Sequence, residues 1–556
     1  MTHQSVPTPL AASADWYPKK SVGDLPQDAA RRFGDRTALL FEGRSYSFTE
    51  YAEQVDRAAR ALLALGVRPG DHVAVWLNNS PDWLFIQYAI ARVGAVLVPI
   101  NTRFRTDDTA YLLRQSDSAF LICHDTAGPV DFLGMVRRIV SLPQGEEEID
   151  DPNYPRLRRV VTLSETRAPG TLNWADLLAA GDAIAPADLE RRAASVDPDA
   201  VFVILYTSGS TGYPKGVMHA HILLRSIEQR GYKSNISPTD TILNYLPLFH
   251  AFGLSEGSLM SLATGARQIL TVFFDPDEAL DIAEREKVTI LHGFDIHINM
   301  LMDAQEARPR DLSALRFGWL PAGPSNVVSV AERALRVLAP WRCFSGFGMT
   351  ETWTGACVGS IDDSDEQICA GSGRPSLGFE VRIADPETDQ PLPEGQQGEI
   401  QLTGFTVMKG YYNKPDETRA TFSADGWLKS GDVGYWRPDG HLRFCGRIKD
   451  MLKVGGENVD TLEIESYLLG HPDIKQAFVT GIESRRLSEV PVAFVELRPG
   501  AEATEQALID FCRNHMASFK VPRRVTFVTE FPMTGSGKIR KVDLRADARE
   551  RFGVLE

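Results

Sequence analysis

Short apolar runs alternate with helical patterns through the first part of the chain, and this alternation restricts the fold more than any other feature. The apolar runs lie at 72–77, 95–100 and 119–125, and helical patterns at 81–94 and 107–116 separate them. Parallel strands joined by covering helices produce this rhythm. We therefore predict an α/β fold whose large, multi-layer N-terminal body has mostly parallel sheets covered by helices.

The character of the sequence changes near residue 450. Turn-rich segments there precede strand-like runs that flank a helical pattern at 503–516. Residues 450–556 carry 15 basic and 17 acidic residues and are nearly neutral, although the whole chain has a formal charge of −15. A chain of 556 residues is long enough for several domains. We predict an N-terminal body at 1–449 and a small α+β C-terminal domain at 450–556.

The charge balance and the cysteine pattern exclude several classes of protein. A net charge of −15 gives no broad basic surface for a nucleic acid or an anionic membrane. The six cysteines show neither C-x-x-C nor zinc-site spacing, which favours a reducing, cytoplasmic location. The most apolar long stretch, 84–100, contains Gln87 and Arg92 and is too short to span a bilayer, so we expect a buried helix that runs into a strand. The N-terminus lacks the apolar segment of a secretory signal.

A Ser/Thr/Gly-rich loop follows the predicted buried strand at 200–206. Its sequence from Thr207 to Gly216 is TSGSTGYPKG. Glycines let backbone N–H groups converge on an anion, the hydroxyls donate further hydrogen bonds, and Lys215 adds a positive charge. The loop lacks the Gly-Lys-Ser/Thr of a Walker A motif. The residues alone therefore predict either a phosphate-binding loop or a plain turn.

The string YTSGSTGYPKGV at 206–217 resembles the signature of the adenylate-forming superfamily, which comprises acyl-CoA synthetases, luciferases and the adenylation domains of peptide synthetases. Further segments resemble the other motifs of that superfamily, in the expected order. They are LPLFH at 246–250, GFGMTET at 346–352, 398–415, SGD at 430–432, GRIKD at 446–450 and GSGKI at 535–539. The resemblance extends from about residue 30 to about residue 545.

The resemblance implies a two-step ligation that uses ATP, Mg²⁺ and coenzyme A. A carboxylate attacks the α-phosphate of ATP, pyrophosphate leaves, and the thiol of coenzyme A captures the acyl-adenylate. Thr350 would contact the α-phosphate, and Glu351 would be the Mg²⁺ ligand. Phe347 would stack on adenine beside Gly348 and Met349. The residues implied to bind the β and γ phosphates are Thr207, Ser208, Gly209, Ser210, Thr211, Gly212 and Lys215.

Three further residues complete the nucleotide site that the resemblance implies. Asp432, with the help of Arg447, would bind the ribose hydroxyls, although an Asx turn would also explain this aspartate. Gly323 would supply a backbone contact near adenine, but Ala322-Gly323-Pro324 departs from the expected Gly-Gly-Ala-Pro spelling. Two histidines follow the phosphate loop, His219 and His221. They have no metal-site spacing and are assigned structural roles.

The resemblance also implies that the body at 1–449 binds the nucleotide and the acyl group, and that 450–556 is a mobile lid domain whose orientation changes during the reaction. Lys538 would bridge the attacking carboxylate and the α-phosphate during adenylation. Asp450 matches the hinge position, and rotation there would remove Lys538 from the site. The residues that would then line the coenzyme A passage are Lys453, Gly455, Gly456 and Glu457. A tight hairpin turn explains the two glycines equally well.

The acyl pocket is expected to have apolar and aromatic walls, which suit a carboxylic acid with an apolar body. The residues assigned to it are His250, Phe294, His297, Trp319 and Trp353. The preferred substrate is a medium-chain fatty acid. The alternatives are an aryl or alicyclic acid, an adenylating enzyme that loads a carrier protein, and a silent nucleotide-binding module. Homo-oligomer formation is left open by the sequence.

Overall fold

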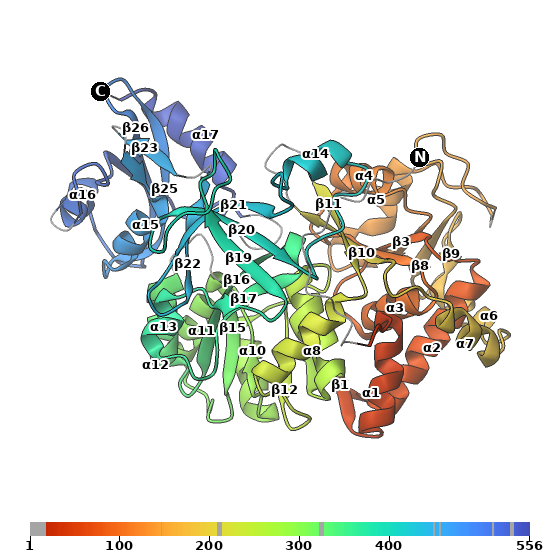
Figure 1. Ribbon diagram of the computed structural model, residues 1–556. Helices are drawn as coiled ribbons and strands as arrows, with labels where there is room; N and C mark the ends of the chain where they lie inside the picture. Colours follow the sequence, from red (N-terminus) through yellow and green to blue (C-terminus); the bar gives the residue numbers. More distant parts are fainter. Residues whose placement is uncertain are drawn as a thin grey trace.

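The computed structural model describes residues 18–145, 147–207, 214–321, 327–448, 451–454, 457–513, 516–533 and 539–555. Figure 1 shows an N-terminal body of sheets and covering helices, with a smaller C-terminal part at one side of it. The predicted α/β architecture is therefore confirmed, with a large body and a smaller C-terminal domain.

One large sheet of the body has seven strands in the order β11-β10-β4-β3-β5-β8-β9. All neighbours are parallel except β10 and β11. The strands are β3 (His72–Trp76), β4 (Val96–Pro99), β5 (Phe120–His124), β8 (Arg159–Leu163), β9 (Leu172–Asn173), β10 (Val201–Thr207) and β11 (Lys215–Ala220). Three of these strands, β3 to β5, coincide with the apolar runs, as the sequence predicts.

The second large sheet has nine strands in the order β18-β17-β16-β15-β14-β12-β13-β1-β2 and is parallel from β16 to β1. Its edges are antiparallel. The strands are β1 (Thr37–Phe41), β2 (Arg44–Ser47), β12 (Thr241–Asn244), β13 (Arg267–Leu270), β14 (Ile290–Leu291), β15 (Phe317–Pro321), β16 (Arg342–Met349), β17 (Thr354–Val358) and β18 (Arg374–Pro375).

Helices cover and separate these sheets. They are α1 (Leu25–Phe33), α2 (Phe48–Ala64), α3 (Pro81–Arg92), α4 (Thr106–Gln115), α5 (Phe132–Ile139), α6 (Trp174–Gly181), α7 (Pro186–Ala194), α8 (Leu223–Lys233), α9 (Met260–Thr264), α10 (Pro276–Glu286), α11 (Asp295–Ala307), α12 (Val327–Val337), α13 (Asp365–Ala370) and α14 (Pro415–Ala420). Shorter elements are the 3₁₀ turns η2 (Val22–Asp24) and η4 (Thr350–Thr352), the π-helix η3 (Gly253–Leu259), and the two-stranded pair β6 (Thr126–Ala127) and β7 (Val130–Asp131).

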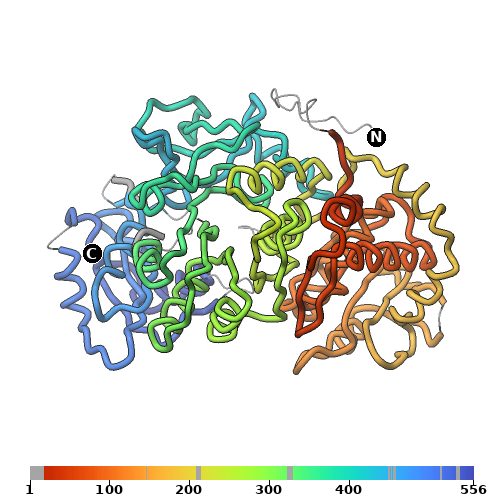
Figure 2. The backbone as a smooth tube through the Cα atoms, turned by 90° about the horizontal axis from the view of Figure 1, so that it is seen from below, coloured from red at the N-terminus to blue at the C-terminus, as the bar shows by residue number. Residues whose placement is uncertain are grey.

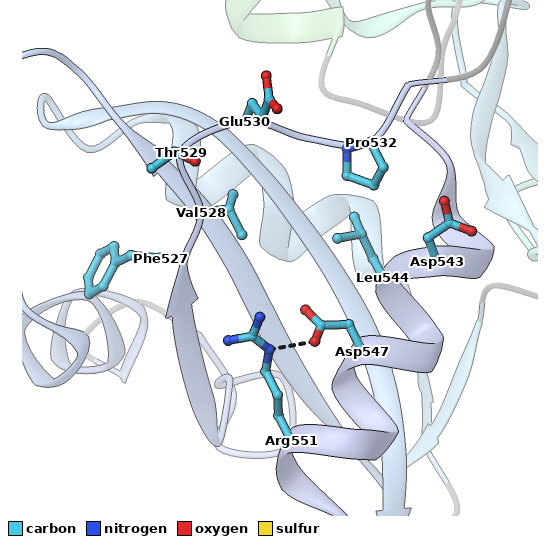
Figure 3. Close-up of a pocket in the computed structure, with 9 residues that line it drawn as sticks. All are labelled: Phe527, Val528, Thr529, Glu530, Pro532, Asp543, Leu544, Asp547 and Arg551. Carbon is cyan, nitrogen blue, oxygen red and sulfur yellow. Dashed lines mark hydrogen bonds and ion pairs between the residues drawn. The ribbon is translucent and has the colours of Figure 1, made fainter.

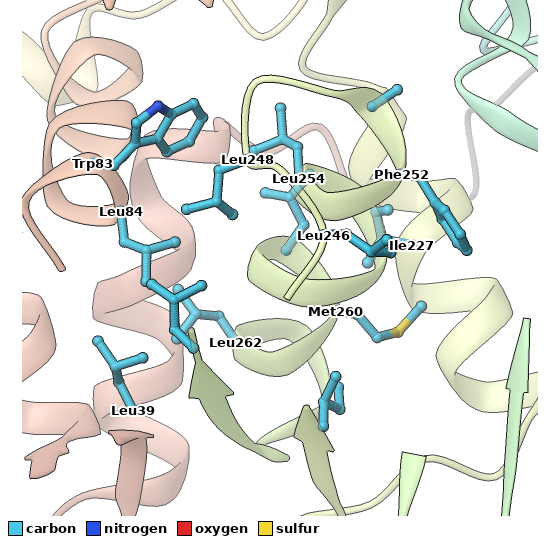
Figure 4. Packing of buried hydrophobic residues seen from close by; sticks show 14 of the residues in the cluster. Leu39, Trp83, Leu84, Ile227, Leu246, Leu248, Phe252, Leu254, Met260 and Leu262 are labelled. Atoms are coloured by element: carbon cyan, nitrogen blue, oxygen red, sulfur yellow. The ribbon is translucent and has the colours of Figure 1, made fainter. Parts of the chain in front are cut away.

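The largest apolar cluster of the body contains residues from both large sheets. Helix α3 belongs to this cluster and is buried on nearly every side. The helix begins because Ser80 Oγ accepts the Trp83 N–H at 3.2 Å and Pro81 occupies the first turn. Figure 4 shows Trp83 and Leu84 of this helix packed opposite Leu248 and Leu254, which precede and belong to η3. The apolar stretch 84–100 is thus a buried helix followed by β4, as predicted.

A four-stranded antiparallel sheet completes the body and leads into the C-terminal sheet. Its strands are β19 (Phe379–Ala384), β20 (Gly398–Gly404), β21 (Leu428–Trp436) and β22 (Leu442–Arg447). The C-terminal elements are β23 (Leu452–Val454), β24 (Glu457–Val459), α15 (Thr461–Leu469), β25 (Ile474–Ser484), β26 (Ser488–Leu497), α16 (Glu505–Arg513), β27 (Arg524–Phe527) and α17 (Lys541–Phe552). The last strand of the four-stranded sheet ends at Arg447 and the C-terminal sheet begins at Leu452. The boundary at 450 stays a prediction.

The C-terminal sheet has its own apolar clusters, which contain only residues from Leu452 onward. Figure 2 shows this part beside the green half of the body and away from the red N-terminal helices. Within the described residues, no helix combines the length and hydropathy needed to cross a membrane. All six cysteines are buried and free.

Candidate active site

The two ends of the phosphate loop are adjacent in the structure. Thr207 ends β10, Lys215 begins β11, and the two residues are directly paired in the antiparallel ladder. The strand predicted at 200–206 is therefore observed, one residue shifted, as β10. Residues 208 to 213 lie outside the described residues, so the phosphate contacts of Ser208, Gly209, Ser210, Thr211 and Gly212 stay predictions.

Lys215 and Glu351 are linked through a tyrosine. The Lys215 ammonium lies 4.7 Å from the centroid of the Tyr411 ring, and Tyr411 Oη donates to Glu351 Oε1 at 2.8 Å. Glu351 is buried, and Met408 N–H donates to its backbone oxygen at 2.8 Å. Burial and the Glu351 carboxylate raise the pKa of Tyr411 well above its usual value, so this phenol remains a donor. The motif at 398–415 contains Tyr411, but the sequence does not show that this tyrosine contacts both Glu351 and Lys215.

A histidine on β11 holds the backbone of Thr350. His219 on β11 donates from Nε2 to the Thr350 carbonyl oxygen at 2.6 Å, and its ring meets the Trp353 ring edge-on at 5.3 Å. Burial lowers the pKa of His219 to about 4, so the imidazole is neutral at pH 7. Trp353 and Thr354 follow η4 with φ values of 55° and 67°, a conformation unusual for their residue types. The motif therefore ends in a turn fixed by several contacts.

Gly348 allows β16 to approach the chain that follows the turn. A Cβ at this position would lie 1.6 Å from the Thr354 oxygen, so only glycine fits. The neighbouring Phe347 ring is buried and lies 5.7 Å from the Phe444 ring at an interplanar angle of 32°. Met349 N–H donates to Thr352 Oγ1 at 3.1 Å and so closes the turn. The adenine-stacking role of Phe347 stays a prediction.

Asp432 and Arg447 are paired across the strands β21 and β22. They are register partners, and Arg447 Nε lies 3.0 Å from Asp432 Oδ1. The Asp432 N–H donates to Ser430 Oγ at 3.0 Å. Gly431 has a φ of 70°, and its N–H donates to Glu399 Oε1 at 3.0 Å. These contacts of β21 thus fix a nearly buried carboxylate beside a half-exposed arginine, which suits the recognition of a ribose diol.

Most of the residues assigned to the acyl pocket lie together. The Phe294 ring lies 5.8 Å from the His250 ring and 5.9 Å from the His297 ring. Trp319 joins this group through its backbone oxygen, which accepts the Gly293 N–H at 3.1 Å. Burial lowers the pKa of His297 to about 4. The recorded ring contact of Trp353 is instead with His219, beside Thr350.

Several predicted positions cannot be placed. Lys538, Gly323, Asp450, Gly455 and Gly456 lie outside the described residues. Lys453 and Glu457 belong to the antiparallel pair β23 and β24, in which Lys453 faces Asn458 and Val454 faces Glu457. The roles assigned to all these residues remain predictions.

Mg²⁺ would be held at Glu351 and by phosphate oxygens of the nucleotide. The described residues contain no group of three or more His, Cys, Asp or Glu side chains that could hold a metal alone. A single buried carboxylate suits Mg²⁺, which keeps several ligands from water and substrate phosphates. Bound there, the ion would neutralise charge on the phosphate oxygens.

A hollow on the C-terminal domain has the wrong charge for a nucleotide. It lies between the end of β27 and α17, and Figure 3 shows Glu530, Asp543 and Asp547 around it. Arg551 Nε donates a hydrogen bond to Asp547 Oδ1 at 2.5 Å. Because carboxylates line the hollow, we do not assign it to ATP or coenzyme A.

Comparison with known proteins defines the family. The model for the AMP-binding enzyme matches residues 26–412, and the model for its C-terminal domain matches residues 463–538. A Mycobacterium tuberculosis CoA ligase for a 7a-methyl-1,5-dioxo-octahydro-indenyl propanoyl group is 37% identical over 93% of this chain and 96% of that protein. A mitochondrial medium-chain acyl-CoA ligase, ACSF2, of Danio rerio is 30% identical over 96% of this chain and 89% of that protein.

A solved structure matches the whole architecture. The anthranilate CoA ligase AuaEII in complex with anthranoyl-AMP has a TM-score of 0.86 and 26% identity, over 97% of this chain and 99% of that chain. The chain therefore belongs to the AMP-binding enzyme family. Within this family it is an AMP-forming acid–CoA ligase.

Proposed function

We propose that the enzyme adenylates a medium-chain monocarboxylic acid with an apolar body and transfers the acyl group to coenzyme A. The observation that carries this proposal is the aromatic cluster in which the Phe294 ring contacts the rings of His250, the motif histidine, and of His297. The medium-chain ligase relative is consistent with it. A second candidate is a ring-bearing acid, since flat rings pack well against such a cluster and two relatives named above act on ring-bearing acids.

In the proposed adenylation step, the chain positions ATP and offsets its charge. The Thr207–Lys215 loop would hold the departing pyrophosphate, and Glu351 would hold Mg²⁺ while Tyr411 fixes its carboxylate. Asp432 and Arg447 would hold the ribose. Lys538 would bridge the carboxylate and the α-phosphate.

In the second step, rotation at Asp450 would withdraw Lys538 and open the passage near Lys453 and Glu457. The thiol of coenzyme A would then attack the acyl carbonyl carbon, and AMP would leave with the bond electrons. We also keep the prediction of a cytoplasmic location, which the absence of paired cysteines supports.

A panel of acids tests the proposal. Pyrophosphate release is measured with fatty acids of increasing length and with aryl and alicyclic acids, each with and without coenzyme A. Medium-chain acids should give the highest kcat/KM, and AMP should accumulate only when coenzyme A accepts the acyl group. Adenylate formation without thioester formation would point to a carrier protein as the acceptor instead.

A further inference from the structure

The two ends of the phosphate loop are held by one helix, α4. Tyr111 on this helix donates from Oη to the Pro214 carbonyl oxygen at 3.0 Å. Tyr206 on β10 donates from Oη to Oε1 of Gln115, the last residue of α4. Tyr111 and Gln115 are four residues apart and therefore lie on one face of the helix. Figure 1 shows α4 beside β10 and β11, the two strands that the loop connects.

The amide of Gln115 also reaches the segment that carries Tyr411. Its Nε2 donates to the Tyr412 carbonyl oxygen at 2.7 Å, and the Tyr412 N–H donates to the Gly216 oxygen at 2.8 Å. Gly216 on β11 is in turn the register partner of Tyr206. A closed set of contacts thus joins α4, both strands of the loop and the segment at 411–412.

The Tyr206 side chain is fixed where it meets Gln115. A Cβ on Gly216 would lie 3.1 Å from Tyr206 Cζ and 2.7 Å from Ile204 Cγ2, so glycine makes room for the tyrosine ring. Burial raises the pKa of Tyr206 well above its usual value, so the hydroxyl stays protonated and remains a donor at neutral pH.

Residues of the proposed nucleotide site adjoin these contacts in the chain. Thr207 follows one tyrosine of the set, and Lys215 follows the proline that α4 holds. Tyr411 precedes the residue whose carbonyl Gln115 binds, and its hydroxyl donates to Glu351 at 2.8 Å. An ion at Glu351 that also binds phosphate oxygens requires a fixed spacing between the loop and this carboxylate.

We infer that Gln115 is a positioning residue for adenylation, because its amide ties the base of the phosphate loop to the segment that orients the proposed Mg²⁺ ligand. This inference rests on the proposed function, which assigns the β and γ phosphates to the loop. Gln115 acts through Tyr206 and Tyr412, and Tyr111 supports the same loop at Pro214.

Gln115→Met tests this role, because methionine has a similar length and helix propensity but lacks the amide. We expect kcat for pyrophosphate release to fall by about tenfold or more, since a small displacement of a substrate-positioning group is costly. Thioester formation from supplied acyl-adenylate and coenzyme A should stay near the wild-type rate, because the adenylate carries no β or γ phosphate.

Nucleotide affinities provide a second measurement. In the presence of Mg²⁺ and without acid, the Kd for ATP should rise several-fold in Gln115→Met, whereas the Kd for AMP should not change. AMP has only the α-phosphate and does not need the loop. A smaller folded fraction would leave the ratio of the two dissociation constants unchanged, so the ratio separates positioning from stability.

The matched control is Gln305→Met on α11. The Gln305 amide also makes two hydrogen bonds, donating to the Arg310 oxygen at 2.9 Å and accepting the Arg310 N–H at 3.0 Å. This variant loses the same two kinds of hydrogen bond as Gln115→Met. It should keep the wild-type ratio of dissociation constants and the rates of both half-reactions.

Tyr206→Phe removes one of the two Gln115 bonds and keeps the ring beside Gly216. Its effect should be smaller than that of Gln115→Met. The double variant should be no slower than Gln115→Met alone, because both changes break the same contact. If Gln115→Met does not fold, Tyr206→Phe and Tyr111→Phe decide the question by the same ratio of dissociation constants.

The outcomes separate the two proposals. An unchanged ratio of the ATP and AMP dissociation constants in Gln115→Met, or equal slowing of both half-reactions, would overturn the positioning role alone. Failure of the wild-type enzyme to release pyrophosphate with any acid would instead overturn the proposed function.

Discussion

Tyr411 Oη donates to Glu351 Oε1 at 2.8 Å, although 60 residues separate the two in the sequence. The same tyrosine ring lies under the Lys215 ammonium, so one side chain connects the phosphate loop with the proposed Mg²⁺ ligand. The carboxylate is therefore oriented before any substrate binds.

Tyr411→Phe should weaken Mg²⁺ use while keeping the ring below Lys215. We expect the Mg²⁺ concentration for half-maximal pyrophosphate release to rise several-fold, because a hydrogen bond to a charged group contributes about 1.5–3 kcal/mol. Tyr412→Phe is the matched control, since its hydroxyl donates to Asp117 at 3.0 Å instead. An unchanged Mg²⁺ requirement in Tyr411→Phe would refute the positioning role.

His219→Leu should slow adenylation by roughly tenfold through loss of the hydrogen bond to the Thr350 carbonyl. The effect should fall on kcat, because Thr350 is proposed to act on the α-phosphate during reaction. Pre-steady-state pyrophosphate release measures it. The control is His221, whose ring accepts the Val22 N–H at 3.0 Å. The variant His221→Leu should lower thermal stability but leave kcat for the remaining folded enzyme close to normal. Equal losses of kcat would contradict the proposal.

Asp432→Asn should raise the KM for ATP by about tenfold, because a neutral amide accepts hydrogen bonds from ribose hydroxyls less strongly. Nucleotide analogues that lack one ribose hydroxyl should lose less affinity in the variant than in the wild-type enzyme. Asp425→Asn is a suitable comparison, since Asp425 pairs with Arg382 in the same sheet region at 2.6 Å. A KM for ATP that Asp432→Asn leaves unaltered would remove Asp432 from the ribose site.

Asp460 should make the stability of the protein depend on pH near neutrality. It caps α15 through the Leu462 N–H at 2.9 Å and lies against Gly446 of β22. Burial raises its pKa to about 7, although the hydrogen bond from the Leu462 N–H lowers it; Glu463 adds to the increase, and Arg443 and Lys541 oppose it. Because the folded pKa exceeds the unfolded value, this stabilising contribution is complete below pH about 4 and is lost as pH rises through about 7.

Asp460→Asn cannot ionise and should flatten that pH dependence. Melting temperatures measured from pH about 5.5 to about 8.5 should show the variant gaining on the wild-type protein as the pH rises. A wild-type profile parallel to that of the variant would contradict the raised pKa.

Lys538→Ala should block the first half-reaction and spare the second. Pyrophosphate release from acid and ATP should fall by several orders of magnitude, since this lysine is proposed to offset charge in the adenylation transition state. Thioester formation from supplied acyl-adenylate and coenzyme A should persist near the wild-type rate. Equal loss of both steps would argue against alternation between two domain orientations.

The fold could be predicted from the sequence because its signals are local. The strand and helix periodicities of 72–124 and the loop between β10 and β11 depend on residues close together in the chain. The resemblance predicts the motif residues Thr350, Glu351 and Asp432, and the structure places the first two on η4 and the third on β21, with Glu351 and Asp432 buried.

The contacts that complete the site could not be predicted, because they join residues distant in sequence. The sequence around His219 does not indicate that its ring donates a hydrogen bond to the Thr350 carbonyl oxygen. The charged residue Arg230 occupies α8, where such residues usually face solvent, yet it is buried. Burial of a charge depends on partners from other elements, and a single sequence does not show which element supplies them.

The six buried cysteines affect the chemistry of the enzyme as well as its core. Burial raises the pKa of every one of these thiols, for example that of Cys369 to about 11 and that of Cys123 to about 12. The thiolate is the form of sulfur that attacks an activated acyl group. An acyl-adenylate made by this protein is therefore shielded from attack by the protein's own cysteines, so that coenzyme A can compete for it without a rival thiolate.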